Sequence, residues 1–501
     1  MKNNKIIYLI SFFSGFLSLG QEIIWMRLIS FAGMSVPQTF SYTLAIFLVG
    51  ISVGAQIGKL ICKNNNNVKV HVLGYVFFIA AIVDIFLIAC VYFFSHFIGI
   101  SILFFGLCVF ICAAVRGIIF PLVHHVGTVQ EKTGAQISNV YFSNVFGSAL
   151  APLIIGFIAL DYLNTQQVYL IICFMTFVVA ILCLNSKNIK GLIAVLSFLT
   201  LFMVLIPEHI FYELSKNSYD ENKYPSHILE NKHGFIQVYD EGDDHIVFGA
   251  NVYDGKFNTN IFHNTNGIDR AYLLTTIKPD AKNVLVIGLS TGSWVKVLTT
   301  MPNVEKITVI EINPAYVELI KISPIVSDIL KDKRVEIIFD DGRKWLKKNQ
   351  EQKFDIVLMN TTWHWRAYVS NLLSYDFLKI INGSLGKGGV LFYNTTQSLD
   401  AYYTAKKVFP YVYKYKYFVL ASNQKQSIRL DSIQSNLCDL KDYFTKVPVF
   451  SSEKKCLDAA KIIIENPFLS YSEINFSQLN RSPEVITDNN MLSEYKYGKG
   501  L

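Results

Sequence analysis

The sequence is poor in charged residues. Of its 501 residues only 17% are Asp, Glu, Lys or Arg, whereas a soluble globular chain carries about 25%. This shortage argues against a chain that is soluble throughout and calls for a large apolar region. That region is 1–212, which holds nearly all of the long apolar runs, while 213–501 has the composition of an ordinary soluble protein.

The chain also lacks the residue clusters of nucleic-acid binding and of metal binding. Its net charge of +7 is not gathered into arginine-rich blocks, so we expect no nucleic-acid partner. The eight cysteines have no Cys or His neighbours at zinc spacing, and six of them fall in or beside apolar segments. We therefore expect neither a metal site nor a disulfide framework.

Seven segments approach the roughly 20 apolar residues that a helix needs to cross a bilayer. They are 6–28, 38–62, 71–95, 97–121, 136–160, 165–184 and 191–207. The last is short and is followed directly by Pro207 and Glu208. No small-residue cleavage site follows the first run, so we expect a retained span rather than a signal peptide. The sequence thus predicts a helical membrane domain of six to seven spans over 1–212.

The lysines between the predicted spans suggest an orientation. Lys59, Lys63 and Lys69 lie around the connection between the second and third spans, and Lys187 and Lys190 lie between the sixth and seventh. The positive-inside rule places both loops in the cytoplasm. Seven crossings would put the C-terminal half outside, away from the cell's nucleotide cofactors, unless the seventh segment lies along the interface or dips back. We expect a multi-pass protein of the inner (plasma) membrane with a cytoplasmic soluble half.

Polar residues interrupt several of the predicted spans: Gln21, Glu22, Arg27, Asp84, Arg116, Asn139 and Asn144. Charge is costly in lipid, and such residues usually face a protein interior. They predict either a polar pocket or substrate path, or an ion pair that fixes helix packing, for instance Glu22 with Arg116. Gly50, Gly54 and Gly58 form a G-x-x-x-G ridge that permits close approach of a second helix.

The soluble half has two patterns. Residues 213–281 contain the short alternating segments "GFIQVYD" and "HIVFGANVYDGK", which are typical of a small β-hairpin lid. Residues 282–501 alternate strands with helices, which predicts a parallel sheet of βαβ units and a Rossmann-like α/β class. The predicted strands are 283–288, 306–313, 335–341, 354–360 and 388–394, and the helices include 293–301, 314–322 and 370–385.

Candidate ligand-binding residues follow the first three of these strands, where open α/β sheets bind ligands. The first strand ends in Gly288-Leu289-Ser290-Thr291-Gly292, whose glycines allow a tight turn beside the positive end of a helix. The second ends in Glu311, which can accept hydrogen bonds from both ribose hydroxyls. The third ends in Asp340-Asp341-Gly342, beside the expected adenine edge. The second and third strands end in acidic residues, and the turn lacks the third glycine of the dinucleotide-binding fingerprint. Both features favour S-adenosylmethionine over NAD.

The membrane half contains the runs "SGFLSLGQEIIWMRLISFAG" and "FSYTLAIFLVGISVGAQIGK". These runs resemble the membrane part of bacterial fused transporter-like/spermidine-synthase proteins. That family has an E-x-x-W-x-R pattern, matched by Glu22, Trp25 and Arg27, and a Y-x-x-N-x-x-G pattern beginning at Tyr141. These motifs are mainly structural.

The soluble half is similar to the aminopropyltransferase family, spermidine synthase above all, from about 232 to 396. The likeness rests on "VLVIGLSTGSWVKVL", "KITVIEINPAYVELIK", "RVEIIFDDGRKWL" and "FDIVLMNTT", and "VITDNNMLSEY" resembles the D-x-x-x-x-x-E-Y tail of the fused members. It implies that Gly288, Gly292, Glu311 and Asp341 bind S-adenosylmethionine or decarboxylated S-adenosylmethionine.

The chain departs from that family at the aspartates that bind cationic groups of the donor and the acceptor. The family's glycine loop has an Asp where this chain has Thr291, and its D-x-x-D strand end corresponds to Asn360 and Trp363. Those aspartates serve a cationic aminopropyl group and a cationic polyamine through charge-assisted hydrogen bonds, which need an ionised partner. An amide such as Asn360 also cannot take up a proton as a general base.

A run of aromatic and basic residues follows Asn360 beside the expected cofactor site. Its side chains are those of Trp363, His364, Trp365, Arg366 and Tyr368. The histidine is a candidate general base, since its reference pKa of about 6.5 suits neutral pH. The aromatic residues could wall a slot for a cation or a flat substrate, and the arginine could hold a carboxylate. Alternatively, the tryptophans pack the loop and the histidine bonds only to backbone.

We expect a membrane-anchored transferase that resembles spermidine synthase and moves an aminopropyl group to an amine or polyamine-like acceptor. One alternative is methyl transfer from S-adenosylmethionine. Another is a transporter of a polyamine or other solute with a nucleoside-sensing domain, and a third is a scaffold that has lost catalysis. Besides the acceptor, we expect the lipid bilayer and, in a homodimer, a second copy of the chain as partners.

Overall fold

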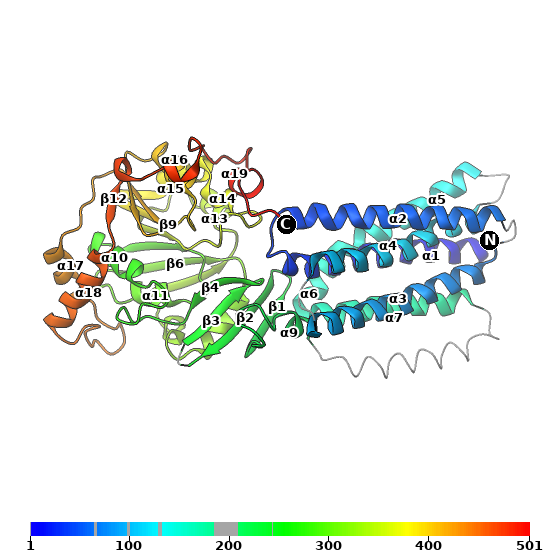
Figure 1. Cartoon of the computed structure of the whole chain (residues 1–501), viewed down its shortest axis with the longest axis horizontal. Helices are drawn as coiled ribbons and strands as arrows, with labels where there is room; N and C mark the ends of the chain where they lie inside the picture. The colour runs from blue at the N-terminus through cyan, green and yellow to red at the C-terminus, as the bar shows by residue number, and fades with distance from the viewer. Residues whose placement is uncertain (1, 65–67, 98–100, 129–132, 185–208, 243) are drawn as a thin grey trace. The chain divides into compact units, whose positions relative to one another are not determined.

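The computed structural model describes residues 2–64, 68–97, 101–128, 133–184, 209–242 and 244–501 (Figure 1). Contacts divide the chain into two units, Met1–Phe235 and Ile236–Leu501. The seventh expected span, 191–207, lies outside the described residues. The first unit is a helical bundle, and the second is an α/β domain.

The described residues of the first unit contain six helical stretches that are long and apolar enough to cross a membrane. The helices of this unit are α1 (Lys2–Ala32), α2 (Gln38–Asn64), α3 (Val70–Phe97), α4 (Ile102–Gly127), α5 (Thr133–Ala151), the π-helical η2 (Pro152–Ala159), α6 (Leu160–Tyr162), α7 (Thr165–Cys183) and the short α9 (Ile210–Leu214). The fifth candidate span combines α5, η2 and α6. The first six expected segments are therefore confirmed as long apolar helices, with the fourth starting a little later than predicted.

The glycine ridge of α2 packs directly on α4. A Cβ on Gly54 would collide with the backbone carbonyl of Ala114, and one on Gly50 would lie 2.7 Å from the Cβ of Ala113. Larger side chains would force the two helices apart, so the predicted close approach is confirmed.

The ion pair suggested between Glu22 and Arg116 is wrong. Arg116 of α4 instead pairs with Asp84 of α3, and both side chains are buried between helices that pack together. The Tyr169 hydroxyl, from α7, donates a hydrogen bond of 2.7 Å to the backbone carbonyl of Asp84. These contacts tie three helices together at a polar centre inside the bundle.

Three of the other predicted polar residues contact neighbouring segments, whereas the Gln21 amide is buried without a hydrogen-bond partner. Arg27, in the last turns of α1, pairs with Glu230 at 3.1 Å. Asn144 donates to the backbone carbonyl of Ser11 at 3.1 Å and thereby joins α5 to α1. Asn139 reaches the hydroxyl of Tyr8, also on α1, at 3.5 Å.

A small antiparallel sheet has the order β1 (His227–Asn231), β2 (Gly234–Glu241), β3 (Asp244–Gly249) and β4 (Val252–Lys256). Ala250 and Asn251 turn β3 into β4, with φ of 49° and 64°. Two successive left-handed residues are typical of the tight turns that join hairpin strands. The predicted hairpin region is therefore confirmed.

The second unit is built on an eight-stranded sheet of order β12-β10-β11-β9-β8-β5-β6-β7. Its strands are β5 (Asn283–Ile287), β6 (Lys306–Glu311), β7 (Val335–Phe339), β8 (Phe354–Met359), β9 (Leu385–Asn394), β10 (Tyr411–Tyr415), β11 (Phe418–Ser422) and β12 (Phe468–Ser470). Strands β5 to β9 pair in parallel and confirm the five predicted strands. The antiparallel β10, β11 and β12 were not predicted.

The strand order reverses between β5 and β8. The chain winds outward through β6 and β7, then returns to place β8 on the opposite side of β5. Ligands of open α/β sheets bind in the crevice outside the carboxyl ends of the strands at such a point. The fold thus directs attention to the ends of β5, β6, β8 and β9.

Helices and short turns cover and extend this sheet. They are α10 (Asp269–Ile277), α11 (Ser293–Leu298), α12 (Ala315–Ile322), η3 (Ser327–Leu330), α13 (Gly342–Lys348), α14 (Ser370–Leu373), α15 (Tyr375–Ser384), α16 (Leu399–Lys406), α17 (Leu430–Cys438), α18 (Glu453–Glu465), η4 (Tyr471–Glu473), η5 (Ser477–Leu479) and α19 (Leu492–Tyr495). Val357 and Leu391, paired on neighbouring strands, are fully buried with Phe377 of α15. Burial on both faces explains why the parallel strands are continuously apolar.

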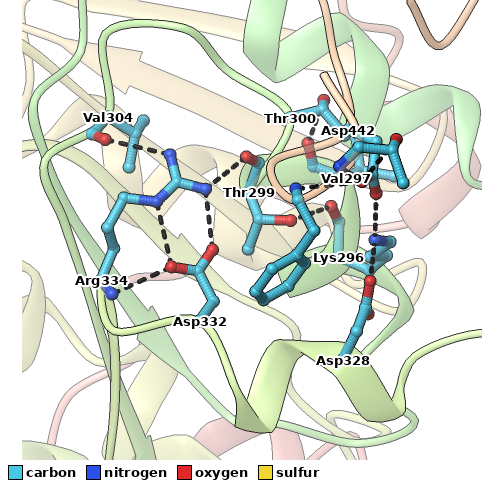
Figure 2. A network of polar contacts seen from close by, with 11 residues as sticks. Lys296, Val297, Thr299, Thr300, Val304, Asp328, Asp332, Arg334 and Asp442 are labelled. Carbon is cyan, nitrogen blue, oxygen red and sulfur yellow. Dashed lines mark hydrogen bonds and ion pairs between the residues drawn. The ribbon is translucent and has the colours of Figure 1, made fainter. Parts of the chain in front are cut away.

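A polar network braces α11, the helix that follows the glycine turn (Figure 2). Lys296 of α11 lies between Asp328 and Asp442, the latter at 2.8 Å. The guanidinium of Arg334 bonds to the Asp332 carboxylate and donates to the carbonyl of Thr299, which caps α11, at 2.7 Å. These charge-assisted bonds hold both sides of the helix in place.

One disulfide corrects the expectation of no disulfide framework. Cys438, at the end of α17, is bonded to Cys456 in the first turn of α18, with their Cα atoms 5.5 Å apart. The two residues are 18 positions apart and belong to helices that pack against each other. Cysteine spacing alone does not report that packing.

Candidate nucleoside and acceptor site

The turn after β5 has the tight backbone that its glycines predict. Gly288 and Gly292 have φ of 91° and 73°, and Ser290 between them has φ of 48°. A Cβ on Gly288 would lie 3.2 Å from the backbone carbonyl oxygen of Asn360, at the end of β8. A glycine is therefore required where the ends of β5 and β8 come together.

The hydroxyls of this turn bond to β4 of the small sheet. Ser290 Oγ donates to the carbonyl of Asp254 at 3.3 Å, and Thr291 Oγ1 donates to that of Lys256 at 3.1 Å. Ser293 Oγ donates to the same Lys256 carbonyl at 3.0 Å. The small sheet therefore closes one side of the turn.

Glu311 ends β6 beside this turn and is only 5% exposed. Its carboxyl group accepts the backbone N–H of Leu289 at 2.7 Å and that of Asn313 at 2.8 Å. Burial raises the pKa of Glu311 to about 7; the two N–H donors lower it and the charge of Asp254 raises it. Each carboxylate oxygen has more than one lone pair, so both can accept a further hydrogen bond.

The acids after β7 lie at the start of α13. Asp341 accepts the backbone N–H of Lys344 at 2.7 Å and so caps the helix, while Asp340 pairs with the Lys344 ammonium at 3.0 Å. A Cβ on Gly342 would lie 2.7 Å from the side chain of Ile287 on β5. Asp341 is exposed, and its predicted role toward an adenine ring stays a prediction.

A cavity of about 200 Å³ opens beside the glycine turn. It is lined by Tyr253, Asp254, Asn266, Arg270, Trp294, Asn360, Thr361, Thr362, Trp363, Asn394, Thr396, Gln397 and Tyr417. These residues come from β4, from α10 and the chain before it, from α11, from the chain after β8, from the end of β9 and the chain after it, and from the turn between β10 and β11. Asn360 and Trp363 are the sequence-predicted residues among them.

The cavity is lined by one acidic and one basic side chain. Asp254 has one carboxylate oxygen, Oδ2, that is buried without a hydrogen-bond partner, while Tyr316 and Ser290 bond to its carboxyl group. Burial raises the pKa of Asp254. The guanidinium of Arg270 lies over the rings of Trp294, at 5.1 Å, and Phe418, at 4.7 Å. Its nitrogens also donate to backbone carbonyls, so this cation is held by the protein itself.

His364 bonds to the chain after β9 and does not line the cavity. The ring Nδ1 lies 2.9 Å from both the carbonyl oxygen and the hydroxyl oxygen of Thr396. The backbone N–H of His364 donates to the same hydroxyl at 2.7 Å. Burial lowers the pKa of His364, so the neutral ring is favoured. A catalytic role for His364 stays a prediction.

The other residues of the predicted substrate loop are dispersed. Trp365 stacks on Trp363 with ring centres 6.1 Å apart, and Tyr368 is 76% exposed. Arg366 donates to the Thr362 hydroxyl at 2.9 Å, and its charge acts on nearby Asp254. The loop therefore brings Trp363 to the cavity and Arg366 near its acid, but not all four predicted side chains into one slot.

The C-terminal tail holds this loop in place. Glu494, which is 1% exposed, accepts the backbone N–H of Tyr368 at 2.9 Å and of Ser370 at 2.7 Å. Earlier in the tail, Asp488 pairs with Arg343 of α13, which lowers the pKa of the Asp488 carboxyl. The two acids of the D-x-x-x-x-x-E-Y pattern thus bind the tail to α13 and to the loop after β8.

Several cavity residues escaped the sequence reasoning. Asn394 ends β9, and the strand-end rule that found Glu311 would also have found it. Asp254 and Arg270 lie before β5, in the hairpin strand β4 and in α10, where no sequence pattern marks a ligand. They reach the cavity because the small sheet packs on the glycine turn.

The strand order and the site at its switch point define the second unit as an open α/β domain of Rossmann-like class with a mixed sheet. Residues 272–419 match the family model described as the spermine/spermidine synthase domain. That segment includes β5 to β10, the start of β11, the predicted nucleoside residues and much of the cavity. The C-terminal half thus carries a spermidine-synthase-like domain.

Two curated proteins that this chain is similar to are polyamine aminopropyltransferases. The enzyme of Clostridium beijerinckii is 36% identical over 85 residues, which are 17% of this chain and 30% of the enzyme. That of Prochlorococcus marinus is 30% identical over 115 residues, 22% of this chain and 40% of the enzyme. The chain therefore spans about a third of the length of the curated relatives it matches.

Solved spermidine synthases are more distantly similar. The enzyme of Thermotoga maritima has 17% sequence identity and a TM-score of 0.36, over 48% of this chain and 84% of that one. A spermidine synthase solved in complex with the transition-state analogue AdoDATO has 18% identity and a TM-score of 0.35, over 45% and 80%.

Proposed function

We propose that the chain is a membrane-anchored transferase of the aminopropyltransferase type. It would take decarboxylated S-adenosylmethionine as donor and an amine as acceptor. The observation that carries the proposal is the buried carboxyl group of Glu311, next to the left-handed turn at Gly288 and to a cavity lined by Asp254, whose Oδ2 is buried without a hydrogen-bond partner.

The residues present fit a nucleoside donor. Glu311 is fixed by two backbone N–H groups and would accept ribose hydroxyls, while Gly288 lets the backbone approach a ligand where a Cβ would meet Asn360. Asp341, exposed at the end of β7, would meet the base edge. A sulfonium donor, when bound, supplies the carbon that the acceptor amine attacks.

Asp254 is the residue that we propose to receive the acceptor amine. Among the described residues that line the cavity it is the one carboxyl group, and its Oδ2 has no hydrogen-bond partner. A buried carboxylate oxygen without a hydrogen-bond partner is costly unless a cation or a proton joins it. Its raised pKa also suits proton uptake from an ammonium group. Asn360, which corresponds to a family Asp, would then orient the amine through its amide oxygen.

The balance of charge in the cavity limits the acceptor. One carboxylate can neutralise one ammonium group, and the fixed cation of Arg270 opposes a second one nearby. The stacked Trp363 and Trp365 add aromatic surface beside the amides. We therefore propose an acceptor with a single amine at its reacting end and an uncharged or acidic remainder.

The bundle would anchor this domain in the inner membrane. Its six long helices expose large apolar side chains, among them Phe86 at 64%, Phe142 at 67% and Phe157 at 65%. An exposed apolar surface of this extent on a helical bundle is more stable in contact with lipid than with water.

Methyl transfer from S-adenosylmethionine is the second candidate. The amide side chains of Asn266, Asn360 and Asn394 line the cavity where a donor with a cationic aminopropyl group would favour additional carboxylates. A methyl donor has no need of them.

The product nucleoside distinguishes the two reactions. Purified full-length protein is incubated with each donor and a panel of primary amines, and the nucleosides are identified by mass spectrometry. Release of 5′-methylthioadenosine from decarboxylated S-adenosylmethionine, lost in Asp254→Asn, supports aminopropyl transfer. Release of S-adenosylhomocysteine supports methyl transfer.

The matched control is Asp355→Asn, a half-buried aspartate that accepts backbone N–H groups at the opposite end of the strands. It should leave turnover unchanged. No product from either donor, with wild-type protein that still binds the nucleoside, would contradict both reactions.

A further inference from the structure

The bundle has one end that is rich in lysine. Here α2 ends and α3 begins, and Lys59, Lys63 and Lys69 lie around this connection. The end of α7 lies at the same end of the bundle, because a Cβ on Gly74, near the start of α3, would lie 2.6 Å from the side chain of Leu184. We call this the lysine end.

The described chain resumes at the opposite end. Glu213 of α9 lies 2.9 Å from the ring of His96, in the last turn of α3. Glu230 of β1 pairs with Arg27 near the end of α1 and accepts the backbone N–H of Thr165 at the start of α7. We call this the far end, and α9 lies there against the end of α3 (Figure 1).

The two ends are separated by the length of α3, which has 28 residues. At 1.5 Å per residue that is about 40 Å, enough to cross a membrane. The chain leaves α7 at the lysine end and is next described in α9 at the far end, so Leu184 and His209 lie at opposite ends of the bundle. Phe235, which leads into the second unit, follows from the far end.

Charge assigns the two ends to the two sides of the membrane. The connections at the far end, 33–37, 98–101 and 163–164, contain no Lys or Arg. The three lysines between 209 and 235 accompany four acidic residues and lead into a long domain, which the charge rule does not govern. The positive-inside rule therefore puts the lysine end in the cytoplasm and the far end outside it.

The cysteines point the same way independently. Both cysteines of the second unit, Cys438 and Cys456, are joined in a disulfide. The six free cysteines all belong to the helices of the bundle. Disulfides persist in oxidising compartments and are rare in the cytoplasm.

We infer that the spermidine-synthase-like domain lies on the non-cytoplasmic side of the membrane, with its nucleoside site facing an oxidising compartment. This inference rests on the proposed membrane insertion, and it differs from the cytoplasmic domain expected from sequence. A soluble domain that follows the far end cannot return through the bilayer. The nucleoside donor must then be supplied outside the cytoplasm, so a membrane export step has to precede the transfer reaction.

The test uses the full chain in a Gram-negative host, with a reporter fused after Leu501. Alkaline phosphatase folds only after export and green fluorescent protein fluoresces only in the cytoplasm. We expect an active phosphatase fusion and a dark fluorescent fusion. An inactive phosphatase with a fluorescent counterpart would overturn the inference. Reporters inserted in the connection between α2 and α3 are the matched control and should behave in the opposite way.

A thiol count provides a second readout. Protein from the same cells is denatured and treated with a maleimide polymer, with and without prior reduction. We expect six modified thiols without reductant and eight with it. Eight without reductant would remove the cysteine argument. Carbonate extraction tests membrane insertion separately. A chain recovered in the soluble fraction would contradict the proposed anchoring itself, whatever the two other readouts show. Neither readout depends on catalysis.

Discussion

Replacing Glu494 with alanine tests whether the C-terminal tail holds the loop that leads from β8 to α14. The Glu494 carboxylate accepts two backbone N–H groups, those of Tyr368 and Ser370, and is 1% exposed. Alanine would leave both N–H groups without this acceptor, and the bond from Ser370 is buried. Each hydrogen bond to a charged group contributes about 1.5 kcal/mol or more, so the pair contributes about 3 kcal/mol.

A loss of that size would raise the local opening equilibrium by about a hundredfold, since 1.4 kcal/mol is a factor of ten. Hydrogen–deuterium exchange measured by mass spectrometry reports it directly. Peptides that cover 363–373 should exchange much faster in Glu494→Ala, whereas peptides from β5 should be unchanged.

Glu494→Gln keeps one acceptor oxygen, and we expect an intermediate effect of about tenfold. Glu351→Ala, which removes an exposed carboxylate, is the control and should leave exchange in 363–373 unaltered. If Glu494→Ala and Glu351→Ala give the same exchange in this loop, the tail does not hold it and the reasoning fails.

Three further predictions address the ligand site, the disulfide and the bundle. Because the pKa of Glu311 is about 7, its charged form, the stronger hydrogen-bond acceptor, dominates only above that pH. Binding of 5′-methylthioadenosine should therefore tighten from pH about 6 to about 8, and a profile in Glu311→Gln as steep as in the wild type would refute this assignment. Replacing Cys438 and Cys456 with serine opens a closed loop of 18 positions, so the free energy of unfolding of the second unit should fall by about 3 kcal/mol; an unchanged urea midpoint would speak against it. Gly54→Val should lower the thermal stability of the detergent-solubilised protein because it forces α2 from α4, at a cost of about 1–3 kcal/mol or more. Gly156→Val, where a Cβ meets nothing within 4 Å, should be tolerated, and equal losses would argue against helix packing as the cause.

Local pattern was enough to predict the parallel core of the soluble half. Strands β5 to β9 are short apolar runs that end at or just before a glycine or a polar residue. Such runs predict buried strands without knowledge of the elements that pack on them. The same rule placed Gly288, Glu311 and Asn360 at one edge of the sheet. Antiparallel β10 alternates tyrosines with a valine and a lysine, and β11 and β12 are short runs of five and three residues, so their pairing depends on contacts that only the folded chain supplies.

Long-range contacts account for what sequence reasoning missed at the candidate site. Asp254 lines the cavity because β4 bonds to the glycine turn, and no local feature of β4 announces that contact. Likewise Asp84, rather than Glu22, pairs with Arg116, because the choice depends on which helix faces α4. Side-chain type alone suggested His364 as a base, whereas its contacts with Thr396 leave that role a prediction.

The most direct test of the account is whether the full-length protein binds a nucleoside through Glu311. Isothermal titration calorimetry with 5′-methylthioadenosine on purified protein measures this without assuming a reaction. We predict binding by the wild type and a loss of affinity of about tenfold to a hundredfold in Glu311→Gln, which removes charge-assisted hydrogen bonds to the ribose. No binding by folded wild-type protein, or equal affinity in both proteins, would contradict the proposed nucleoside site.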